Sequence, residues 1–416
     1  MRSAYNFNVR VVIGYMKKLR IAVIGGGLTG CCSAASLHDI AEEITVFESD
    51  PLLMDEASFY NEGRIHLGYT YGMDKSLDTV RLMAKTAVVF EKLLVRWFGS
   101  EISKVPRSSP FNYTVHKNGL MNGDEYANHA RRVGEIVRGV LEKDDTCFGV
   151  DLKKMPHKLS SAYMSSHYDI NNIISAFETN EISVDPEAIA EIIRKNILKI
   201  PRVNVRPQSE VLRIHVDGSK YKIEVRTTNS KPSTETFDCV INASGRDLLR
   251  LDAFLGLKPP EDPLFRLKYL IRTKTKDIDL PSSSVVLGMF GEVVSFEDYM
   301  TLAWYPAGRL DWYQGLAPKK AEPILKEEPA ATNLKAEIVR GLSTIVPKLK
   351  NMRFDNSELK GNWIFAPGTS DVNNPKSRLH KRTDVGIRQV GNYFSIDPGK
   401  YTTAPYFANE LAKRFL

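Results

Sequence analysis

Three glycines and one glutamate near the start of the chain have the types and spacing of a site for phosphate and ribose. Gly25, Gly27 and Gly30 satisfy the pattern GxGxxG, and Glu48 follows Gly30 by 18 residues. In this pattern the first glycine makes a tight turn, the second lets a pyrophosphate approach bare backbone, and the third lets a helix pack closely on a strand. A glutamate at this distance accepts hydrogen bonds from a ribose diol and repels a 2′-phosphate. The residues therefore predict a dinucleotide other than NADP.

The elements around these residues are those that a dinucleotide site requires. Residues 19–24 (LRIAVI) are an apolar, branched run that predicts a buried strand ending in the glycine turn. Residues 28–37 are rich in small side chains and predict a helix whose N-terminus offers free N–H groups to phosphates. Residues 44–47 predict a second strand that ends at Glu48. This context supports dinucleotide binding but does not choose between FAD and NAD.

A second segment, residues 57–72 (ASFYNEGRIHLGYTYG), points to the cofactor. It resembles the N-x-G-x-I-H-x-G segment of L-2-hydroxyglutarate dehydrogenase-like enzymes, and it is similar to the I-H-x-G element of glycerol-3-phosphate dehydrogenases. The residues that carry the match are Asn61, Gly63, Ile65, His66 and Gly68. These enzymes belong, with glycine oxidase, to the D-amino-acid-oxidase superfamily of flavoproteins, in which this segment passes along the isoalloxazine ring. The resemblance implies FAD as the cofactor.

Three later segments resemble the same superfamily, in the expected order. Residues 182–186 (ISVDP) resemble the entry to a flavin-domain helix, although Asp-Pro is also an ordinary helix start. Residues 237–245 (FDCVINASG) resemble the strand under the cofactor, and residues 390–407 resemble the closing strand, loop and helix, with Lys400 where the family commonly has Leu. The sequence has no second GxGxxG and no Asp-Gly motif of the aromatic-hydroxylase type. These absences argue against NAD(P)H-driven reductases and flavin monooxygenases.

The resemblance implies an FAD site assembled from all of these segments. The expected cofactor-binding positions are Gly25, Gly27, Leu28, Thr29, Gly30, Glu48, Ser58, Asn61, Gly63, Arg64, Val211, Ala243, Gly245, Gly399, Lys400, Tyr401, Thr402 and Thr403. Backbone N–H groups at the start of the last helix would stabilise the negative pyrimidine edge of reduced flavin. Lys400 would add to that effect or would face the substrate.

The residues beside the expected flavin predict its chemistry. His66 is the candidate base for a substrate O–H or N–H, and otherwise it only packs along the ring. Arg64 lies two residues earlier, so an extended segment points both side chains to one face. Candidate clamps for a substrate carboxylate are Arg64, Arg266 and Arg309, and candidate pocket-lining tyrosines are Tyr69, Tyr71, Tyr305 and Tyr401. The predicted catalytic set is His66, Arg64, Tyr305 and Lys400.

We expect an α/β fold with a Rossmann-like FAD-binding domain and a second, mixed-sheet α+β domain for the substrate. The FAD-binding domain is expected to be discontinuous and to comprise residues 18–96, 181–255 and 354–416. The substrate-binding domain is expected to comprise residues 97–180 and 256–353, where the resemblance is weak.

Two local patterns complete the predicted organisation. Residues 74–98 predict a long amphipathic helix with a cap at Asp74 or Ser76. Residues 300–306 and 309–315 predict a hairpin that turns at Ala307-Gly308. Family analogy makes the sheet that contains this hairpin the roof over the flavin.

Composition limits the class of protein. With 416 residues, 43% hydrophobic and 26% charged, the chain is long enough for two or three folded domains, and disorder or coiled coil is excluded as the main architecture. No apolar run approaches the roughly 20 residues of a membrane-spanning helix. Lys and Arg exceed Asp and Glu by 57 − 50 = 7, which suits an anionic small-molecule substrate. No basic stripe with interleaved aromatics is present, so a nucleic-acid partner is not expected.

Cysteines and histidines give no sign of a disulfide framework or a metal site. The four cysteines show no CxxC spacing, which favours a reducing, cytoplasmic location. His116, His157, His167 and His215 are scattered without ligand spacing, so no metal is expected. Residues 1–17 lack the apolar core of a signal peptide and are expected to be a loose extension.

The sequence as a whole predicts an FAD-dependent oxidoreductase, an oxidase or a dehydrogenase. It would oxidise a C–H bond next to nitrogen or oxygen in an amine, an amino-acid-like or a 2-hydroxy-acid-like substrate, by hydride transfer to flavin N5. The alternatives are a flavin-dependent tailoring enzyme for a nucleotide-linked sugar or carrier-bound intermediate, an RNA-modifying flavoprotein, and a flavin-binding protein without turnover.

Overall fold

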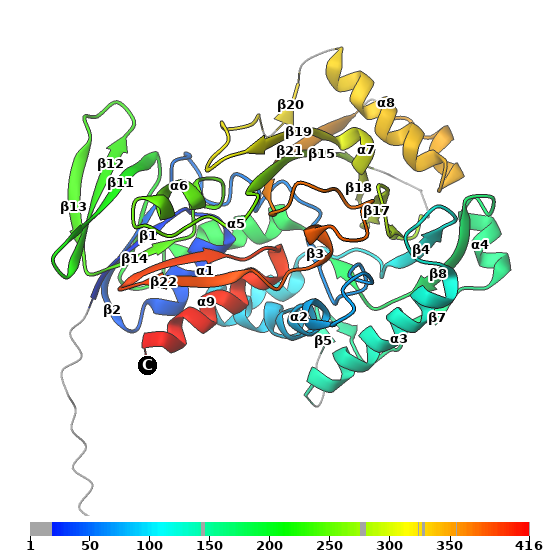
Figure 1. Cartoon of the computed structure of the whole chain (residues 1–416), viewed down its shortest axis with the longest axis horizontal. Helices are drawn as coiled ribbons and strands as arrows, with labels where there is room; N and C mark the ends of the chain where they lie inside the picture. Colours follow the sequence, from blue (N-terminus) through cyan, green and yellow to red (C-terminus); the bar gives the residue numbers. More distant parts are fainter. Residues whose placement is uncertain are drawn as a thin grey trace, which may run out of the picture.

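The computed structural model describes residues 19–142, 146–274, 280–322, 324–326, 329–354 and 356–415. Two sheets and the helices packed on them make up most of these residues (Figure 1). The expected loose extension over residues 1–17 lies outside the described residues.

The first sheet has six strands in the order β10-β2-β1-β14-β23-β22. They are β1 (Leu19–Ile24), β2 (Ala41–Phe47), β10 (Val203–Arg206), β14 (Cys239–Asn242), β22 (Gly386–Val390) and β23 (Tyr393–Asp397). All neighbours run parallel except β22 and β23, which are antiparallel. The expected parallel sheet is therefore present, and β1 lies near its middle, as a nucleotide-binding strand does.

The side chains of β1 alternate between two cores, because successive residues of a strand point to opposite faces. Ile21 and Val23 pack into the larger core, whereas Ala22 and Ile24 pack into a smaller one. Helices α1 (Leu28–Leu37), α2 (Asp78–Phe98), α5 (Pro186–Ile197) and α9 (Ala404–Ala412) contribute to the larger core. A three-stranded antiparallel sheet, β11 (Ser209–Asp217), β12 (Lys220–Thr227) and β13 (Ser233–Phe237), covers the other face.

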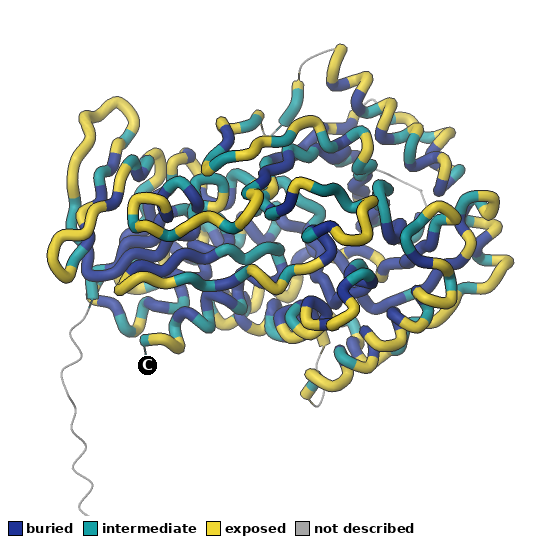
Figure 2. The backbone as a smooth tube through the Cα atoms, viewed as in Figure 1, coloured by how far each residue is buried: buried dark blue, intermediate teal, exposed yellow. Residues whose placement is uncertain are grey.

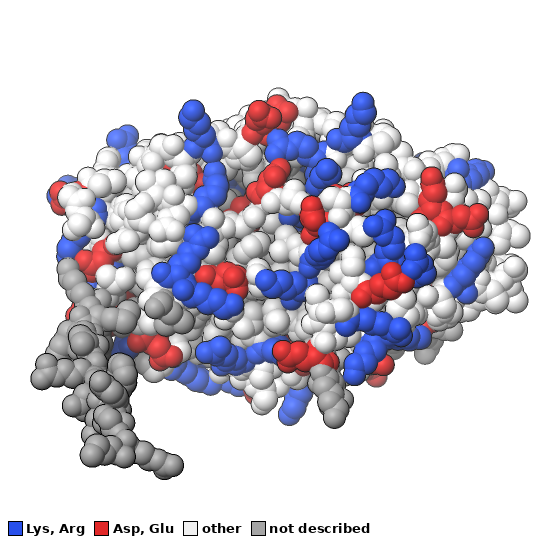
Figure 3. All heavy atoms as spheres, turned by 60° about the horizontal axis from the view of Figure 1, so that its bottom comes forward, with Lys and Arg blue, Asp and Glu red and all other residues white. Residues whose placement is uncertain are grey.

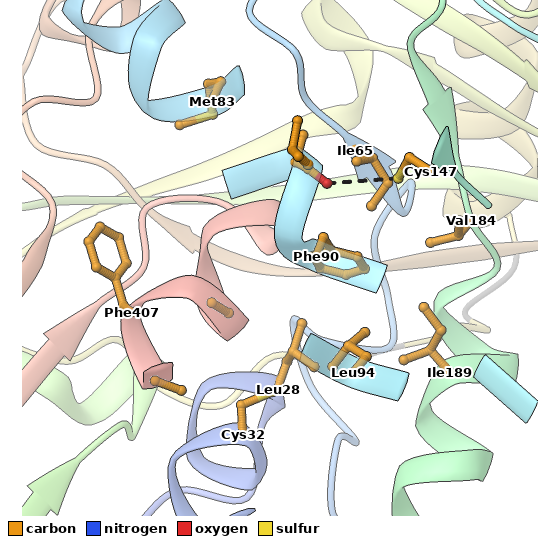
Figure 4. Close-up of a cluster of buried hydrophobic side chains, with 14 of the residues drawn as sticks. Leu28, Cys32, Ile65, Met83, Phe90, Leu94, Cys147, Val184, Ile189 and Phe407 are labelled. Carbon is orange, nitrogen blue, oxygen red and sulfur yellow. Dashed lines mark hydrogen bonds between the residues drawn. The ribbon is translucent and has the colours of Figure 1, made fainter. Parts of the chain in front are cut away.

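The larger core joins segments that are far apart in the sequence. Figure 4 shows Leu28 and Cys32 of α1 near Leu94 of α2, with Ile189 of α5 on one side and Phe407 of α9 on the other. The small side chains of α1 let it approach the sheet and α9, and Ser36 Oγ donates to the carbonyl of Ala408 across 3.0 Å. Figure 2 shows the four central strands of this sheet, β2, β1, β14 and β23, as buried along most of their length. The glycine turn after β1 is thus held on a rigid base.

The second sheet has ten strands in the order β20-β21-β15-β18-β17-β16-β4-β8-β7, with β19 beside β15. They are β4 (Asn112–His116), β7 (His157–Lys158), β8 (Ile173–Glu178), β15 (Leu264–Lys274), β16 (Ser283–Val286), β17 (Gly291–Ser295), β18 (Tyr299–Trp304), β19 (Arg309–Gln314), β20 (Ile324–Leu325) and β21 (Ser357–Phe365). Among the described strand pairs of this sheet, β16 and β4 run parallel and the others antiparallel. The sheet is therefore mixed, as expected.

Two details of this sheet differ from the sequence-based expectations. The predicted hairpin over residues 300–315 is wrong: β18 and β19 both pair with β15, β18 along residues 271–274 and β19 along residues 264–268. A one-turn helix, α7 (Tyr305–Gly308), carries the chain onward without reversing it, because Pro306 starts a helical turn there. In addition, β21 pairs with β15 in this sheet, although residues 354–416 were expected in the FAD-binding domain.

The other elements pack on or beside these sheets. The remaining helices are α3 (Gly123–Val140), α4 (Ser161–His167), α6 (Leu248–Ala253) and α8 (Ala330–Ser343). Short ladders are formed by β3 (Arg64–Ile65) with β9 (Ile182–Ser183) and by β5 (Thr146–Cys147) with β6 (Val150–Asp151). The long predicted helix begins at Asp78, four residues later than expected, and the carboxylate of Asp74 accepts the backbone N–H of Thr79 at 3.1 Å. Asp185 caps α5 as expected, accepting the N–H of Glu187 at 2.9 Å.

Within the described residues, no helix is both long and apolar enough to cross a membrane, and no cluster of side chains has the makings of a metal site. The four cysteines are free and buried. On the face drawn in Figure 3, acidic side chains lie among the basic ones, so that face has no continuous basic stripe.

Candidate active site

A cavity of about 320 Å³ opens at the carboxyl ends of β1, β2, β14 and β23. In open α/β sheets this edge is where ligands bind. We call this cavity of about 320 Å³ the first cavity. One end is lined by Glu48 of the loop after β2 and by Val211 of β11, and the other by His66 and Lys400. It therefore follows the sheet edge from the nucleotide-type motif to the segments that resemble a flavin site.

The turn after β1 fits a bound pyrophosphate. Gly25 has a φ of +96°, and a Cβ there would lie 2.6 Å from the carbonyl oxygen of Ala243. A Cβ on Gly30 would lie 1.8 Å from the carbonyl oxygen of Gly25, so this glycine packs behind the turn and does not line the cavity. Gly27 faces the cavity at the N-terminus of α1, where a Cβ would lie 3.0 Å from Ser58 Oγ. Bare backbone at Gly27 leaves space for phosphates at the N-terminus of α1.

Glu48 is held at the cavity rim by the backbone around it. Its Oε2 accepts the N–H of Gly26 at 2.7 Å, and its Oε1 accepts the N–H of Asp50 at 2.8 Å. Burial raises the pKa of this carboxyl, while the two N–H groups act in the opposite direction. The carboxylate keeps acceptor capacity for a ribose diol, as the sequence pattern requires.

At the other end, two segments more than 300 residues apart are tied together. Thr402 Oγ1 accepts the backbone N–H of His66 at 2.9 Å and donates to the carbonyl of Arg64 at 3.0 Å. Thr403 Oγ1 donates to the carbonyl of Lys400 at 2.7 Å and so closes the turn before α9. Gly63 packs against the neighbouring strand, since a Cβ there would lie 1.8 Å from the carbonyl oxygen of Val184. The segment around His66 and the closing turn therefore meet.

Most of the sequence-predicted cofactor residues line the first cavity. These are Gly25, Gly27, Leu28, Thr29, Glu48, Ser58, Asn61, Arg64, Val211, Ala243, Gly245, Gly399, Lys400 and Tyr401, and His66 joins them. Four predicted residues are absent from its lining and lie behind it: Gly30, Gly63, Thr402 and Thr403. They shape the wall through the contacts described above.

Sequence reasoning missed several charged and aromatic residues of the first cavity. They include Asp50, Glu56, Arg246, Arg250, Phe265, Trp363, Phe365 and Arg382. Arg246 follows the Asn-Ala-Ser-Gly motif directly, so its position along the chain was a usable signal. Arg382 and the aromatic residues come from segments without a recognisable motif, and only the tertiary structure brings them here.

A second cavity, of about 260 Å³, adjoins the first beneath the ten-stranded sheet. Both cavities are lined by Glu62, Arg64, His66, Ile364, Arg382 and Lys400. Beyond this junction the second cavity is lined mainly by residues of β15, β16, β17 and β18, and by Tyr71 and Tyr305. Of the other tyrosines predicted to line the pocket, Tyr401 lines the first cavity, whereas Tyr69 is wholly buried and its hydroxyl donates to Asn180 at 3.1 Å.

Arg64 is engaged by the protein itself. Its guanidinium pairs with the carboxylate of Glu292, donates to the hydroxyl of Tyr113 at 3.2 Å, and stacks 3.8 Å from the ring centroid of Phe111. A second carboxylate, Glu181, lies 3.8 Å away. Burial opposes the charge of Arg64, but Glu292 and its other neighbours raise the pKa of the guanidinium. Arg64 is thus a buried cation already paired by carboxylates.

The other two predicted clamp arginines are also engaged. Arg266 donates to the carbonyls of Ala366 at 2.7 Å and Gly368 at 2.8 Å. Arg309 lies 3.5 Å from the carboxylate of Asp371 and lines neither cavity. The expectation that Arg64, Arg266 or Arg309 offers a free fork to a substrate carboxylate is therefore not supported, because each guanidinium has partners within the chain.

His66 sits between a buried carboxylate and the cations of the junction. Its Nδ1 lies 3.6 Å from Glu181 Oε1, and Glu181 Oε2 accepts the N–H of Leu67 at 2.7 Å. Tyr113 donates to the same carboxylate. Burial, followed by the charge of Lys400, lowers the pKa of His66 to about 4. The imidazole is therefore neutral at physiological pH.

Lys400 lies at the same junction. Burial, together with the charges of Arg382 and Lys268, lowers the pKa of its ammonium to about 7. Tyr305, the remaining member of the predicted catalytic set, lines the second cavity only, and its hydroxyl donates to Asp371 at 2.7 Å. The structure thus brings His66, Arg64 and Lys400 together at the junction and places Tyr305 on the far wall.

A parallel sheet with a glycine turn at its carboxyl edge, a glutamate placed to bind a ribose and an adjoining second cavity define a class, the dinucleotide-binding enzymes. The sequence matches the family model described as "FAD dependent oxidoreductase" over residues 20–310, which is more than half of the 416 residues. The chain belongs to this family and is an FAD-dependent oxidoreductase, an oxidase or a dehydrogenase, and the cofactor predicted from the sequence is confirmed. Among curated proteins, no sequence matches it.

Solved structures support the fold. L-α-glycerophosphate oxidase from Mycoplasma pneumoniae has a TM-score of 0.62 and 17% identity, over 96% of this chain and 95% of that chain. Glycine oxidase from Geobacillus kaustophilus has a TM-score of 0.62 and 14% identity, over 95% of each chain. L-proline dehydrogenase from P. horikoshii has a TM-score of 0.62 and 16% identity, over 95% of this chain and 92% of that chain. At these identities the likeness extends to the fold alone.

Proposed function

We propose that this enzyme oxidises a C–H bond next to nitrogen or oxygen in a small, anionic substrate, of the amino-acid or 2-hydroxy-acid kind, bound in the second cavity. The observation that carries the proposal is the junction: six residues, among them His66 and Lys400, line both cavities. A substrate in the second cavity would meet the cofactor there. Structures of similar fold include enzymes named for glycerophosphate, glycine and proline, which are all small.

The cofactor supplies the oxidising chemistry: bound FAD accepts a hydride equivalent from the substrate carbon. The residues that would hold it are those of the first cavity, from Gly27 and Glu48 to Gly399 and Lys400. The positive end of α9 begins at Ala404, which also lines this cavity, and it favours negative charge nearby. Lys400 adds a cation at the same place when it is protonated.

His66 is our candidate for the group that takes the substrate's O–H or N–H proton. It is neutral at physiological pH, so a ring nitrogen is free to accept a proton. Burial and the neighbouring Lys400 lower its pKa and so make it a weak base. An anion bound beside Lys400 would offset that charge and raise the pKa of His66. Glu181 supports this role as a positioning residue, since it stands 3.6 Å from Nδ1 and is fixed by the N–H of Leu67.

The size of the second cavity favours a small substrate over the alternatives. Its volume of about 260 Å³ lies below the range of roughly 300–1,000 Å³ typical of drug-sized ligand pockets. The face with mixed charges in Figure 3 also offers no stripe for RNA.

The direct test is anaerobic bleaching of the visible flavin band by a panel of amines, amino acids, 2-hydroxy acids and phosphorylated polyols. We expect at least one small anionic compound to bleach the band in the holoenzyme, and neither NADH nor NADPH to do so at a useful rate. Bleaching by NADH or NADPH alone would replace this proposal with a reductase. A protein that holds FAD but is bleached by no member of the panel would contradict the substrate class.

A further inference from the structure

The described lining of the second cavity carries an excess of positive charge. Its cationic side chains are Arg64, Arg266, Lys268, Arg382 and Lys400, and its carboxylates are Glu62 and Glu292. With Lys400 protonated, as it is below its pKa of about 7, five cations against two carboxylates leave an excess of three positive charges (5 − 2) around about 260 Å³. Because uncompensated charge away from water is costly, such a lining is complementary to an anion.

Each arginine of this lining has hydrogen-bond or ion-pair partners in the chain, although the Nε of all three is buried without one. Arg64 is paired with Glu292, and Arg266 donates to two backbone carbonyls. Arg382 donates through Nη1 to the carbonyls of Leu379 at 3.0 Å and of Lys381 at 2.6 Å. These guanidiniums contribute charge, and each has part of its donors engaged by the chain.

The two lysines differ from them. Within the described part of the chain, neither the ammonium of Lys268 nor that of Lys400 makes a hydrogen bond or an ion pair. Lys268 Nζ lies 5.3 Å from the ring centroid of Tyr305, and Lys400 stands at the junction with the first cavity. Glu62, the one carboxylate of the described lining that is not in an ion pair, has its pKa held low by Lys268 and Lys400 against the effect of burial. One carboxylate thus faces two ammonium groups that keep their donors free.

We propose that Lys268 and Lys400 together bind a dianionic group of the substrate, a phosphate monoester or a pair of carboxylates. This inference rests on the proposed function, because it names the substrate class for the same cavity. Two point-like ammonium groups, with three donors each, suit several oxygens at variable spacing, whereas a single carboxylate is better matched by one arginine fork. A bound dianion would reduce the excess of three positive charges to one, whereas a bound monoanion would reduce it only to two.

The experiment is anion binding to the FAD-loaded enzyme, followed as a shift of the flavin absorbance at constant ionic strength near neutral pH. Sulfate stands for a phosphate ester, malonate for a dicarboxylate, and acetate and chloride for monoanions. We expect saturable binding of sulfate or malonate that is at least about 10-fold tighter than binding of acetate. Tighter binding of sulfate would indicate a phosphate ester in the substrate, and tighter binding of malonate would indicate a pair of carboxylates. Equal affinities for acetate and both dianions would overturn the proposal.

A matched pair of variants tests the assignment to Lys268. Lys274 lies on the same strand, β15, and is exposed, so Lys274→Gln removes an equal charge outside the cavity. We expect Lys268→Gln to weaken dianion binding by about 10- to 100-fold, the loss typical of one charge-assisted hydrogen bond, and Lys274→Gln to leave it unchanged. Equal behaviour of the two variants would contradict the proposal. If Lys268→Gln does not fold, Lys268→Arg, which keeps the charge, should retain tight dianion binding, and its loss would count against the proposal.

Failure of this inference and failure of the proposed function give different results. A holoenzyme that binds sulfate or malonate tightly through Lys268, yet is bleached by no substrate of the panel, keeps the anion site and loses the proposed oxidation. A holoenzyme that is bleached by a neutral amine and does not distinguish dianions from acetate keeps the oxidation and loses the anion site.

Discussion

The two cavities meet at one junction but are built in different ways. The first cavity is shaped by backbone turns: the glycines after β1, the N-terminus of α1, and the closing turn before α9. The second is walled by side chains from β15 to β18 and from the loop around Arg382. Backbone can be specified by a few local residues, whereas a wall of side chains depends on which strands are neighbours. The first region can therefore be recognised from short motifs, and the second is where we propose that the substrate is chosen.

Their charges differ as well. The rim of the first cavity carries carboxylates that follow β2 closely in sequence: Glu48, Asp50, Asp55 and Glu56. The second cavity carries the excess of cations. A cofactor with two phosphates is thus expected to be held there by N–H groups and the helix dipole more than by lysines, while the substrate is recognised by free ammonium groups.

The largest expected effect is the loss of FAD on a substitution in the first cavity that leaves the second cavity unchanged. Gly27 has ordinary extended backbone, with φ of −69°, so Gly27→Val adds no backbone strain and requires only that the Ser58 side chain, 3.0 Å from the new Cβ, shift. Its side chain would occupy the space of the pyrophosphate beside Ser58, and we expect a folded protein that no longer retains FAD. Absorbance at the flavin band after purification and reconstitution checks this. Gly139→Val is the control, because a Cβ at Gly139 meets nothing within 4 Å. A yellow Gly27→Val protein would contradict our placement of the phosphates.

His66→Ala tests the junction itself. We expect FAD to stay bound and the rate of flavin reduction by substrate to fall about 10²–10⁴-fold, as is typical when a general base is lost. Rapid mixing under anaerobic conditions measures the rate, and His157→Ala, at an exposed position, serves as the control. If the flavin of the His66→Ala variant is reduced at the normal rate, His66 has only a structural role, and Tyr71 and Tyr305 become the candidates for the base.

The pH dependence of substrate binding tests whether the charge of Lys400 contributes to the second cavity. Its pKa of about 7 means that it is charged below neutral pH and loses its charge above it. The groups that face it are Arg64, Arg382, Lys268, Glu62 and His66. Because an anion binds the charged form, KM for an anionic substrate should rise above pH 7, by up to about tenfold per pH unit. Lys400→Arg, which stays charged, should flatten the profile. A KM that does not change between pH 6 and pH 8 in the native enzyme would contradict a role for Lys400 in substrate binding.

The smallest effect concerns a contact between the two sheets over the first cavity. Lys320, in the loop after β19, pairs with the carboxylate of Asp50 at the cavity rim. Its side chain is 48% exposed, so the pair is expected to stabilise the closed rim by no more than about 1 kcal/mol. Lys320→Gln should therefore speed FAD release by about fivefold or less. The rate of FAD release after dilution into buffer, followed by flavin fluorescence, measures this effect. Lys319→Gln is the neighbouring control.

The sequence specified most of the first cavity. The strand, the glycine turn, the helix and Glu48 lie within 30 residues, so their geometry follows from local backbone preferences and was predicted in place. The meeting of the segment around His66 with the closing turn was also predicted, but from the order of motifs in a family and not from physics. The role of Arg64 was misread, since its partner Glu292 lies 228 residues away.

What the sequence determined by itself is thus the nucleotide half of the site: short-range spacing fixes turns, caps and the residues that face phosphate and ribose. Only the tertiary structure decided the rest. The strands of the ten-stranded sheet lie in an order that differs from their order along the chain, and β19 lies next to β15 where a hairpin was expected. The packing of this sheet and of the loop at Arg382 against the closing turn places Lys268, Arg382 and Lys400 in one cavity lining. Side chains from segments without local motifs become partners only when those strands pair, because charge compensation in a cavity depends on distance in space and not on distance along the chain.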